Sequence, residues 1–470
     1  MEKLRKEEMS RVRRKVVNGD SLTPITIFQS VKGKKKCLLE SSLKHEETGR
    51  YSFIAVNPYA EIIGKDNQAV IHDYLADSIE TKTGKPLQII EQYLKNQQII
   101  PPDNHPFAGG AIGYIGYDAI RMYEDIGSMP SDELQMPDIH LMLYDTMIMY
   151  DHKRYEVTIT VLNPQNHFTE EQLDDKLDTI AAQLTDYHNV QTGLDPLSIL
   201  TYQSNVEKQK YMDAVQSAKE HIKEGDIFQI VLSQRLSAEF TGSAFSFYRK
   251  LRQDNPSPYM FFIEFEDYTV LGASPESLIK VAGRDVTTNP IAGTRKRGKS
   301  KQEDQLLEKD LLSDEKELAE HRMLVDLGRN DLGKVCKIGT VQLTKYMTIE
   351  KYQHVMHIVS EVKGQLTESM TGLEALVSTL PAGTVSGAPK IRAMQLINEY
   401  EPAKRGVYAG AVGYVGFDGN LDFALAIRTM VIKEKIAYVQ AGAGVVYDSV
   451  PEMEYEETLN KARSLLEVTS

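Results

Sequence analysis

Two pairs of glutamates, each spaced by three residues, are the groups in this sequence best suited to chemistry. Glu454 and Glu457 lie in one acidic segment near the end of the chain, and Glu317 and Glu320 lie in another. Residues three apart on a helix share one face, so each pair predicts two adjacent carboxylates. Mg²⁺ prefers such oxygen ligands. The structural alternative is an acidic first turn that complements the helix dipole, with Glu457 pairing with Lys461 one turn later.

Small residues lie close to these acids in the sequence. Gly442, Ala443 and Gly444 end an apolar, strand-like run, where a ligand can approach the backbone N–H groups closely. A strand is also predicted to end in a small-residue turn at Gly293 and Thr294, where an N–H and a hydroxyl can hold a carboxylate. These segments predict a site for a small dicarboxylic acid held through a hard metal ion.

A run with two histidines, residues 352–360, is apolar and β-branched enough to form a strand. His354 and His357 are three apart and would face opposite sides of it, which argues against a two-histidine metal face. One of them is expected to point into a site, where it can act as a general acid or base. A glycine-rich loop at 381–390 precedes a predicted helix at 388–400 but lacks phosphate-loop spacing, so it supports nucleotide binding only weakly.

Composition excludes several classes of function. The 470-residue chain carries 54 basic and 67 acidic residues, a net charge of −13, which argues against nucleic-acid binding. No run of eighteen apolar residues and no signal-peptide core is present, which predicts no membrane contact and a cytoplasmic protein. The two cysteines, Cys37 and Cys336, lie outside any nucleophile motif, so thiol-based amidotransferase activity within this chain is not expected.

The elements that must position these groups are strands mixed with long helices. Strands without strict βαβ alternation predict an α+β fold. We predict an N-terminal domain at 1–165, a polar linker at 166–205 with a helix at 170–184, and a second domain at 206–470. Residues 20–62 read as a meander of strands, and residues 303–327 as one helix. Residues 110–118 match residues 410–418, an internal echo that predicts similar sheets in the two halves.

Several ordered motifs together resemble the chorismate-utilising enzymes and, within them, the component I family of anthranilate synthases. They are PIAGTR, LAEHRMLVDLGRND, HVMHIVS, GTVSGAPKIRAM, YAGAVGY, IRTM and QAGAG through EYEET. They cover about residues 206–463, and LLES, RYSFI and GGAIGY extend the resemblance into the N-terminal half. The fold implied is that of the family: large antiparallel sheets packed face to face, with helices outside.

The resemblance also implies roles for single residues. Mg²⁺ is expected between Glu320 and Glu457, with Glu317 and Glu454 nearby, and would bind one carboxylate of chorismate. The groups implied to hold the substrate are Gly293, Thr294, Tyr408, Arg428, Gly442, Ala443, Gly444 and Lys461. The catalytic groups implied are His357, as the acid that protonates the departing C4 hydroxyl, with Thr384 orienting ring substituents and Glu276 managing the proton of ammonia.

The activity implied is conversion of chorismate and ammonia to anthranilate and pyruvate through aminodeoxyisochorismate. A separate glutamine amidotransferase subunit, component II, would supply the ammonia in a hetero-oligomer. Several relatives carry a lysine where this chain has Ala292, which can act neither as base nor as nucleophile, so ammonia must attack directly. The alternatives are a component I that makes 4-amino-4-deoxychorismate for folate synthesis, and an inactive protein that binds chorismate or tryptophan.

A regulatory site is implied as well. From the residues alone, 38–42 read as a strand that runs out into a loop. Residues 38–41, which end in Ser41, resemble part of the family's tryptophan site, together with Pro258, Tyr259 and Met260. Residues 43–50 would form the second wall of that site. Feedback inhibition requires tryptophan to favour an inactive arrangement, a coupling of about 1–3 kcal/mol.

Overall fold

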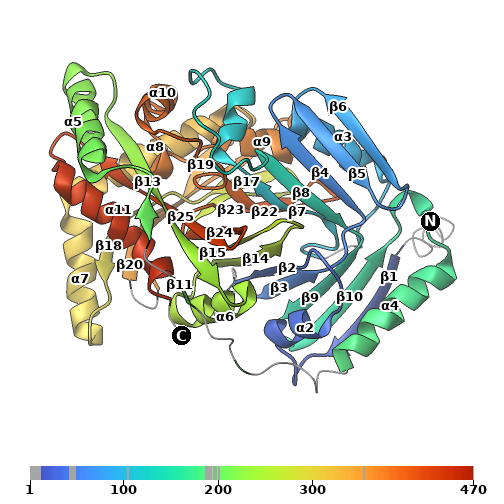
Figure 1. Cartoon of the computed structure of the whole chain (residues 1–470). Helices are drawn as coiled ribbons and strands as arrows, with labels where there is room; N and C mark the ends of the chain where they lie inside the picture. The colour runs from blue at the N-terminus through green and yellow to red at the C-terminus, as the bar shows by residue number, and fades with distance from the viewer. Residues whose placement is uncertain are drawn as a thin grey trace.

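The chain forms two large antiparallel sheets packed face to face with helices on the outside, which confirms the predicted α+β class (Figure 1). This computed structural model describes residues 12–41, 49–102, 105–185, 193, 198–199, 202–352 and 355–468. His354 and most of the predicted second wall of the tryptophan site, residues 43–48, lie outside the described residues. No helix in the described ranges is both long and apolar enough to cross a membrane.

The first sheet has thirteen strands. In spatial order its main path is β1 (Val12–Asn18), β10 (Glu156–Leu162), β9 (Thr146–Asp151), β3 (Tyr51–Ala55), β2 (Cys37–Glu40), β14 (Tyr259–Glu264), β15 (Tyr268–Ser274), β24 (Thr429–Lys433), β25 (Ile436–Val445), β13 (Gln229–Thr241) and β11 (Ser198–Ile199). Two short strands, β12 (Gln203–Ser204) and β21 (Gly387–Ala388), also pair with β13.

The second sheet has twelve strands. Its main path is β18 (Ile291–Lys296), β20 (Val355–Gln365), β17 (Asp285–Thr288), β16 (Ser277–Ala282), β23 (Leu421–Leu425), β22 (Ala411–Gly416), β7 (Gly110–Ile115), β8 (Ile139–Tyr144), β4 (Ala60–Lys65), β5 (Gln68–Asp73) and β6 (Ser78–Thr83). The strand β19 (Gln342–Lys351) pairs with β20.

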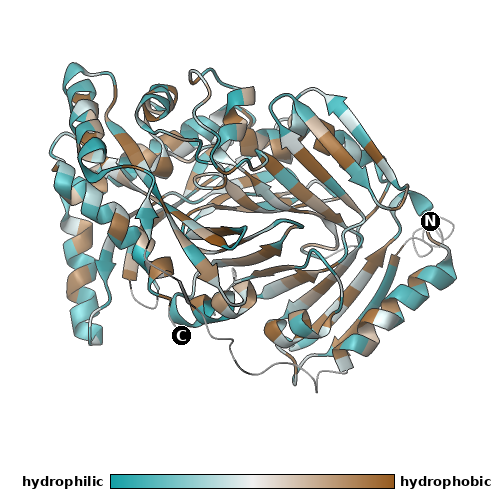
Figure 2. Cartoon of the chain, viewed as in Figure 1, coloured by the Kyte–Doolittle hydropathy of each residue, from teal (hydrophilic) through white to brown (hydrophobic). Residues whose placement is uncertain are grey.

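Helices cover the outer faces of both sheets. They are α2 (Pro24–Ser30), α3 (Pro86–Asn96), α4 (Glu170–Thr185), α5 (Lys208–Glu224), α6 (Ala244–Asp254), α7 (Lys301–Ser313), α8 (Glu315–Gly333), α9 (Gly372–Thr379), α10 (Lys390–Tyr400) and α11 (Pro451–Leu466), with 3₁₀ turns η1 (Tyr117–Met122), η2 (Pro164–Asn166) and η4 (Gly383–Val385). Hydrophobic residues concentrate in the strands and hydrophilic residues on outer helices such as α5 and α7 (Figure 2).

Successive strand residues belong to different cores, which explains the near-continuous apolar runs. Leu39 and Phe261 are buried between the two sheets, whereas their neighbours Leu38 and Phe262 are buried on the outer face of the first sheet with α2, α4 and α6. Side chains alternate across a strand, so a strand covered on both faces needs apolar residues at every position. A third core lies where α3, α5, α9 and α10 pack.

Two predicted elements differ from the sequence interpretation for a local reason. The predicted meander at 20–62 is interrupted by helix α2, because Thr23 caps it in a capping box with Thr26 and Pro24 occupies its first turn. The single helix predicted at 303–327 is two helices, since Asp314 leaves the helical conformation and accepts from the backbone N–H groups of Lys316 and Glu317. That cap places the glutamate pair in the first turns of α8.

The two halves of the chain contribute matching sets of strands. In the first sheet the order β1-β10-β9-β3-β2 is mirrored by β13-β25-β24-β15-β14, and the sets join where β2 pairs with β14. In the second sheet β8-β7 meets β22-β23, and Gly113 lies opposite Gly413. The two echoed segments are therefore paired neighbours. Both sheets contain strands from both halves, so the boundary proposed at 166–205 does not separate one sheet from the other. The division into two domains stays a prediction.

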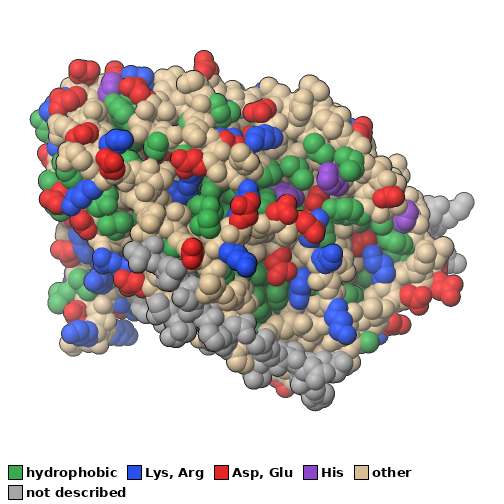
Figure 3. Space-filling view, in the orientation of Figure 1, with side chains coloured by type: hydrophobic (Ala, Val, Ile, Leu, Met, Phe, Trp, Pro, Cys, Tyr) green, Lys and Arg blue, Asp and Glu red, His purple; other side chains and the backbone are tan. Residues whose placement is uncertain are grey.

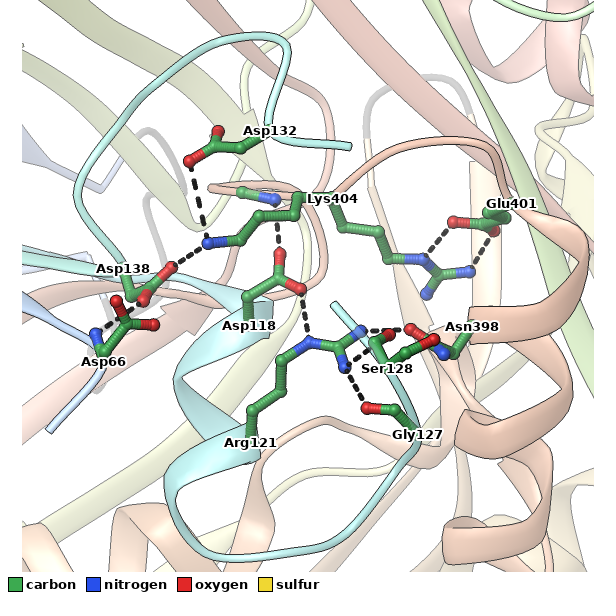
Figure 4. Close-up of polar contacts among 12 residues, drawn as sticks. Asp66, Asp118, Arg121, Gly127, Ser128, Asp132, Asp138, Asn398, Glu401 and Lys404 are labelled. Atoms are coloured by element: carbon green, nitrogen blue, oxygen red, sulfur yellow. Dashed lines mark hydrogen bonds and ion pairs between the residues drawn. The ribbon is translucent and has the colours of Figure 1, made fainter. Parts of the chain in front are cut away.

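Charged side chains also join the halves (Figure 4). Lys404, which follows α10, is buried and binds Asp138 at 2.7 Å, and Arg121 of η1 binds Asp118 at 3.1 Å and the side chain of Asn398 on α10. Asp118 also accepts from the backbone N–H of Gly406 at 3.0 Å. These contacts fix the segment that leads into β22. On the face shown in Figure 3, acidic and basic side chains are interspersed without a large patch of one sign.

Candidate active site

Strands β18 and β20 bring the first predicted site residues together. The pairing slips by one residue between Ala292 and Thr294, and Gly293 occupies the resulting bulge with φ +70°, which favours glycine. The predicted turn at 293–294 is thus a bulge within a strand. The bulge aims the Gly293 carbonyl and the Thr294 hydroxyl at Nδ1 of His357, at 3.0 Å and 3.1 Å.

This contact defines the protonation of His357. A carbonyl only accepts, so Nδ1–H donates to Gly293 and Nε2 carries the lone pair of the neutral ring. Nε2 is buried and has no partner among the described residues. Burial, and to a smaller extent the charge of Arg428, lower the pKa of His357. Nε2 therefore keeps the capacity to form a hydrogen bond with a ligand, as a residue that exchanges a proton with a ligand requires.

Glu276 is a second predicted site residue with a shifted pKa. It is buried and its Oε1 accepts from the Thr384 hydroxyl of η4 at 2.9 Å. Burial raises the pKa of Glu276 to about 8, and the Thr384 bond only partly opposes this. Glu276 therefore carries a proton at neutral pH, and the structure joins two residues that lie 108 positions apart.

Arg428 supplies a positive charge without an acidic partner. Among the described residues no carboxylate lies within ion-pair distance of it, although burial is sufficient to lower its pKa. Its φ of +48° is strained for a side-chain-bearing residue, and Ala409, next to Tyr408, has φ +64°. The charge of Arg428 favours the deprotonated forms of both His357 and Tyr352. The rings of Tyr352 and His357 lie edge to face, with their centroids 5.4 Å apart. Such a partly buried cation as Arg428 suits a carboxylate ligand.

The strand β25 has one open edge at its small residues. β24 pairs with β25 only as far as Val439, whereas β13 accompanies it to Val445, so the stretch 440–445 has a strand partner on one side. A Cβ at Gly442 would lie 2.8 Å from the Tyr408 hydroxyl, which places that hydroxyl beside the strand. Lys461 of α11 donates to the Gly442 carbonyl at 3.1 Å. Thr384 belongs to η4, which contacts β25.

The four glutamates form two crowded pairs. The pKa of Glu317 is raised by burial and by the charge of Glu320, and the pKa of Glu454 is raised by burial and by the charge of Glu457. The charge of Lys316 on α8 reaches Glu454 on α11, so the acidic ends of the two helices are neighbours. A cation would relieve this crowding, and a set of carboxylate oxygens suits Mg²⁺.

The glutamates do not converge as a closed ligand set. Among the described residues, the group of three potential ligands within 4.8 Å of one another is a different set, the partly buried His221 with the exposed Glu224 and Asp226. Glu457 pairs with Lys461 at 2.7 Å, as the structural alternative predicted, and both side chains are about half exposed. The donor types therefore fit the predicted ion, and the pairing between Glu457 and Lys461 is what an ion would have to replace.

Two site neighbours carried too little signal to be singled out from the sequence. Arg295 binds Asp310 at 2.7 Å, Asp314 at 2.8 Å and Glu317 at 3.3 Å, so it neutralises the acids around the α8 cap. Its position after Thr294 in a basic run was the available signal. Tyr352 offered none, because only the fold brings it against His357.

The predicted regulatory residues are also adjacent. β2 pairs with β14 so that Glu40 lies opposite Met260, and Ser41 continues beyond Glu40 toward Tyr259 and Pro258. Glu40 is buried and binds Tyr248 at 2.8 Å and Arg252 at 2.9 Å. The Ser41 hydroxyl is buried without a partner among the described residues. The Tyr259 hydroxyl donates to Asp422 at 3.0 Å.

Comparison with known proteins identifies relatives along nearly the whole chain. The chain is 47% identical over 455 residues to anthranilate synthase component 1 of Lactococcus lactis subsp. lactis (strain IL1403), covering 97% of this chain and 99% of the relative. The crystal structure of anthranilate synthase component I from Streptococcus pneumoniae TIGR4 matches with a TM-score of 0.83 and 44% identity, over 96% of this chain and 99% of that one.

A more distant structure shares the fold alone. MenF, the menaquinone-specific isochorismate synthase from Escherichia coli, matches with a TM-score of 0.74 at 18% identity, over 100% of this chain and 98% of that one. The family model described as chorismate binding enzyme matches residues 35–467. This chain therefore belongs to the family of chorismate binding enzymes.

Proposed function

We propose that this chain is the large subunit of an anthranilate synthase, a lyase that converts chorismate and ammonia to anthranilate and pyruvate. The observation that carries the proposal is the combination of three groups: Arg428, which has no acidic partner among the described residues, His357, whose Nε2 has no partner among them either, and Glu276, whose pKa is raised by burial. These groups suit an anionic substrate whose reaction moves protons. The relatives named component 1 support the choice within the family.

In the proposed mechanism each residue has a defined task. Arg428 binds one substrate carboxylate, and the open edge at Gly442–Gly444 with the Thr294 hydroxyl orients the molecule. His357 gives a proton from Nε2 to the departing C4 hydroxyl, which leaves as water when ammonia adds to the ring. Loss of pyruvate from the resulting aminodeoxyisochorismate then forms anthranilate. Glu276, oriented by Thr384, manages the proton of the incoming ammonia, which it can accept only in its ionised form.

Because the pKa of His357 is lowered, the mechanism requires the bound substrate to promote protonation of the ring. A neutral ring cannot donate from Nε2, and a bound dianion beside it would raise the pKa and stabilise the imidazolium. Mg²⁺, held by Glu320 and Glu457 with Glu317 and Glu454 nearby, would neutralise a carboxylate of chorismate when bound. Lys461, which pairs with Glu457 and donates to the Gly442 carbonyl, would then face the substrate.

The deciding experiment is product analysis. Purified chain incubated with chorismate, Mg²⁺ and ammonium should form fluorescent anthranilate, together with one pyruvate for each anthranilate. Recovery of 4-amino-4-deoxychorismate would show instead the folate-pathway relative, and absence of any product would favour a protein that only binds its ligands. Omission of ammonium is the control and should abolish anthranilate.

We further propose that ammonia comes from a glutamine amidotransferase subunit, component II, in a cytoplasmic hetero-oligomer. The name component 1 of the relatives supports a second component. The test is glutamine in place of ammonium, which should yield anthranilate only when the partner subunit is added. Activity with glutamine by the isolated chain would contradict the division of labour.

Tryptophan is proposed to inhibit the enzyme at Ser41, Pro258, Tyr259 and Met260. The unpartnered, buried Ser41 hydroxyl supports a ligand there. Ser41→Ala should weaken inhibition by roughly 2- to 10-fold, the loss expected when one hydrogen bond to the ligand is removed. Ser30→Ala is the matched control, because that hydroxyl donates to Thr26 within α2. Activity that is unchanged at millimolar tryptophan would refute the regulatory proposal and leave the catalytic one intact.

A further inference from the structure

Gln229 is a buried amide between the acidic helix and the small-residue strand. It begins β13, pairs with Ala388 of β21 and is 4% exposed. Its Nε2 donates to Oε1 of Glu320 at 3.2 Å. Its own Oε1 is buried and has no partner among the described residues. The N–H group of this amide is thus bound to a predicted metal ligand, and its carbonyl oxygen is available to a donor.

The neighbouring strand leaves room for this amide. Gly444 lies opposite Val231, two residues along β13, and a Cβ built on Gly444 would lie 2.9 Å from Nε2 of Gln229. Any larger residue at 444 would displace the amide or the strand. The absence of a side chain at Gly444 therefore serves Gln229 as well as ligand access. One amide touches both the carboxylate side and the backbone side of the site.

An open carbonyl oxygen at this depth is costly. A buried acceptor without a hydrogen bond costs about 1–3 kcal/mol, and an apolar side chain of similar length would avoid that cost. The missing partner must be a donor, because the amide oxygen only accepts. A water carried by a cation at Glu320 is such a donor, since Mg²⁺ usually keeps several of its waters.

We propose that Gln229 is the positioning residue of the cation site. Its N–H fixes one oxygen of Glu320, which leaves the other oxygen for the ion, and its Oε1 accepts a hydrogen from a water that the ion carries. This inference rests on the proposed function, which requires the ion. Partners of this kind that orient a metal ligand affect metal affinity although they do not touch the metal.

The test measures metal affinity directly. Mn²⁺ is titrated into the full chain and followed by electron paramagnetic resonance of the free ion, so that activity is not needed as a readout. Gln229→Met keeps the length of the side chain and removes both hydrogen-bonding groups. It should weaken Mn²⁺ binding about 10- to 100-fold. Gln97→Met is the matched control: Gln97 is also buried and donates to Tyr93, far along the chain in the N-terminal half, and its substitution should leave the affinity unchanged.

A double-mutant comparison separates positioning from general damage. If Gln229 acts through Glu320, Gln229→Met should weaken binding much less in a Glu320→Gln background than in the wild type. Equal losses in both backgrounds, or wild-type affinity in Gln229→Met, would overturn the inference. If the wild-type chain forms anthranilate but binds no Mn²⁺, the cation site fails and the inference with it. If it binds Mn²⁺ yet forms no anthranilate, the proposed function fails and the Gln229 comparison still decides the inference.

Discussion

Glu276 is the residue whose ionisation should be visible in the pH dependence of stability. Burial raises its pKa from 4.5 to about 8, so the folded protein keeps a proton that the unfolded chain releases. The contribution of this bound proton to the free energy of unfolding is fully present below about pH 4.5 and is lost as the pH rises to 8. Glu276→Gln, which cannot ionise, should therefore be more stable than the wild type at pH 8, on the order of a few kcal/mol, and similar at pH 5. Urea unfolding at both pH values measures this, and an equal difference at both would contradict a protonated Glu276.

His357 should matter to rate far more than to folding. Its Nδ1 contact with Gly293 fixes the ring, and its unpartnered Nε2 is the atom offered to substrate. His357→Ala should lower kcat by roughly 10²- to 10⁴-fold, as removal of a general acid does. His321→Ala is the comparison, because Nε2 of that buried ring is hydrogen-bonded to the Ser360 hydroxyl at 2.6 Å. This variant should lower the stability of the protein more than its kcat. Unchanged kcat in His357→Ala would refute the assigned role.

Local signals predicted most elements, and their failures have local causes. Glycine is a typical helix-ending residue, and Gly225 ends α5 in the left-handed conformation with φ +85°. The strand character of 355–360 and the helix at 170–184 were correct. The interruption of 303–327 was missed because Asp314 stands among many acids, where its capping role has no distinct pattern. The helix α2 was missed because only seven residues separate its cap from the next loop.

The placement of site residues was less accessible to sequence reasoning than their identity. Glutamate spacing predicted two helical pairs, and the pairs are on helices. Spacing could not show that Glu276 meets Thr384 or that Tyr352 meets His357, since these contacts depend on which strands become neighbours. The motifs had to be linked through the family resemblance, and the ligand set of the ion stays a prediction.

The α8 cap is the element-scale feature that can be tested alone. The Asp314 side chain accepts from the N–H groups of Lys316 and Glu317 and also binds Arg295. Asp314→Ala should destabilise the protein by about 1 kcal/mol, a typical loss for a cap, and should weaken Mn²⁺ binding because Glu317 lies in the same turn. Ser300→Ala removes the corresponding cap of α7 and should cost similar stability without affecting the metal. Equal effects on Mn²⁺ binding in both variants would contradict the local link.

At the scale of the molecule, the two halves are joined at the centre of both sheets. β2 pairs with β14 and β7 pairs with β22, so each half alone would expose two apolar strand edges. Exposed edges of this kind favour aggregation. The mirrored strand order also explains the echo of 110–118 in 410–418: both segments occupy the same place in their half, and they meet each other. The active-site residues gather in the second half, while the first half supplies Ser41 to the predicted regulatory site.

Unfolding should therefore involve both halves together. A Cβ on Gly113 would lie 2.0 Å from the His140 carbonyl and a Cβ on Gly413 would lie 2.1 Å from that of Asp422, so each substitution by alanine should cost about 1–3 kcal/mol or more. Gly333→Ala, where a Cβ meets nothing within 4 Å, is the control and should be nearly neutral. Because the strands are shared, each destabilising variant should shift a single transition, seen alike by tyrosine fluorescence and by protection of amides in both halves. Two separate transitions, with only the substituted half shifted, would show instead that residues 1–165 and 206–470 fold independently.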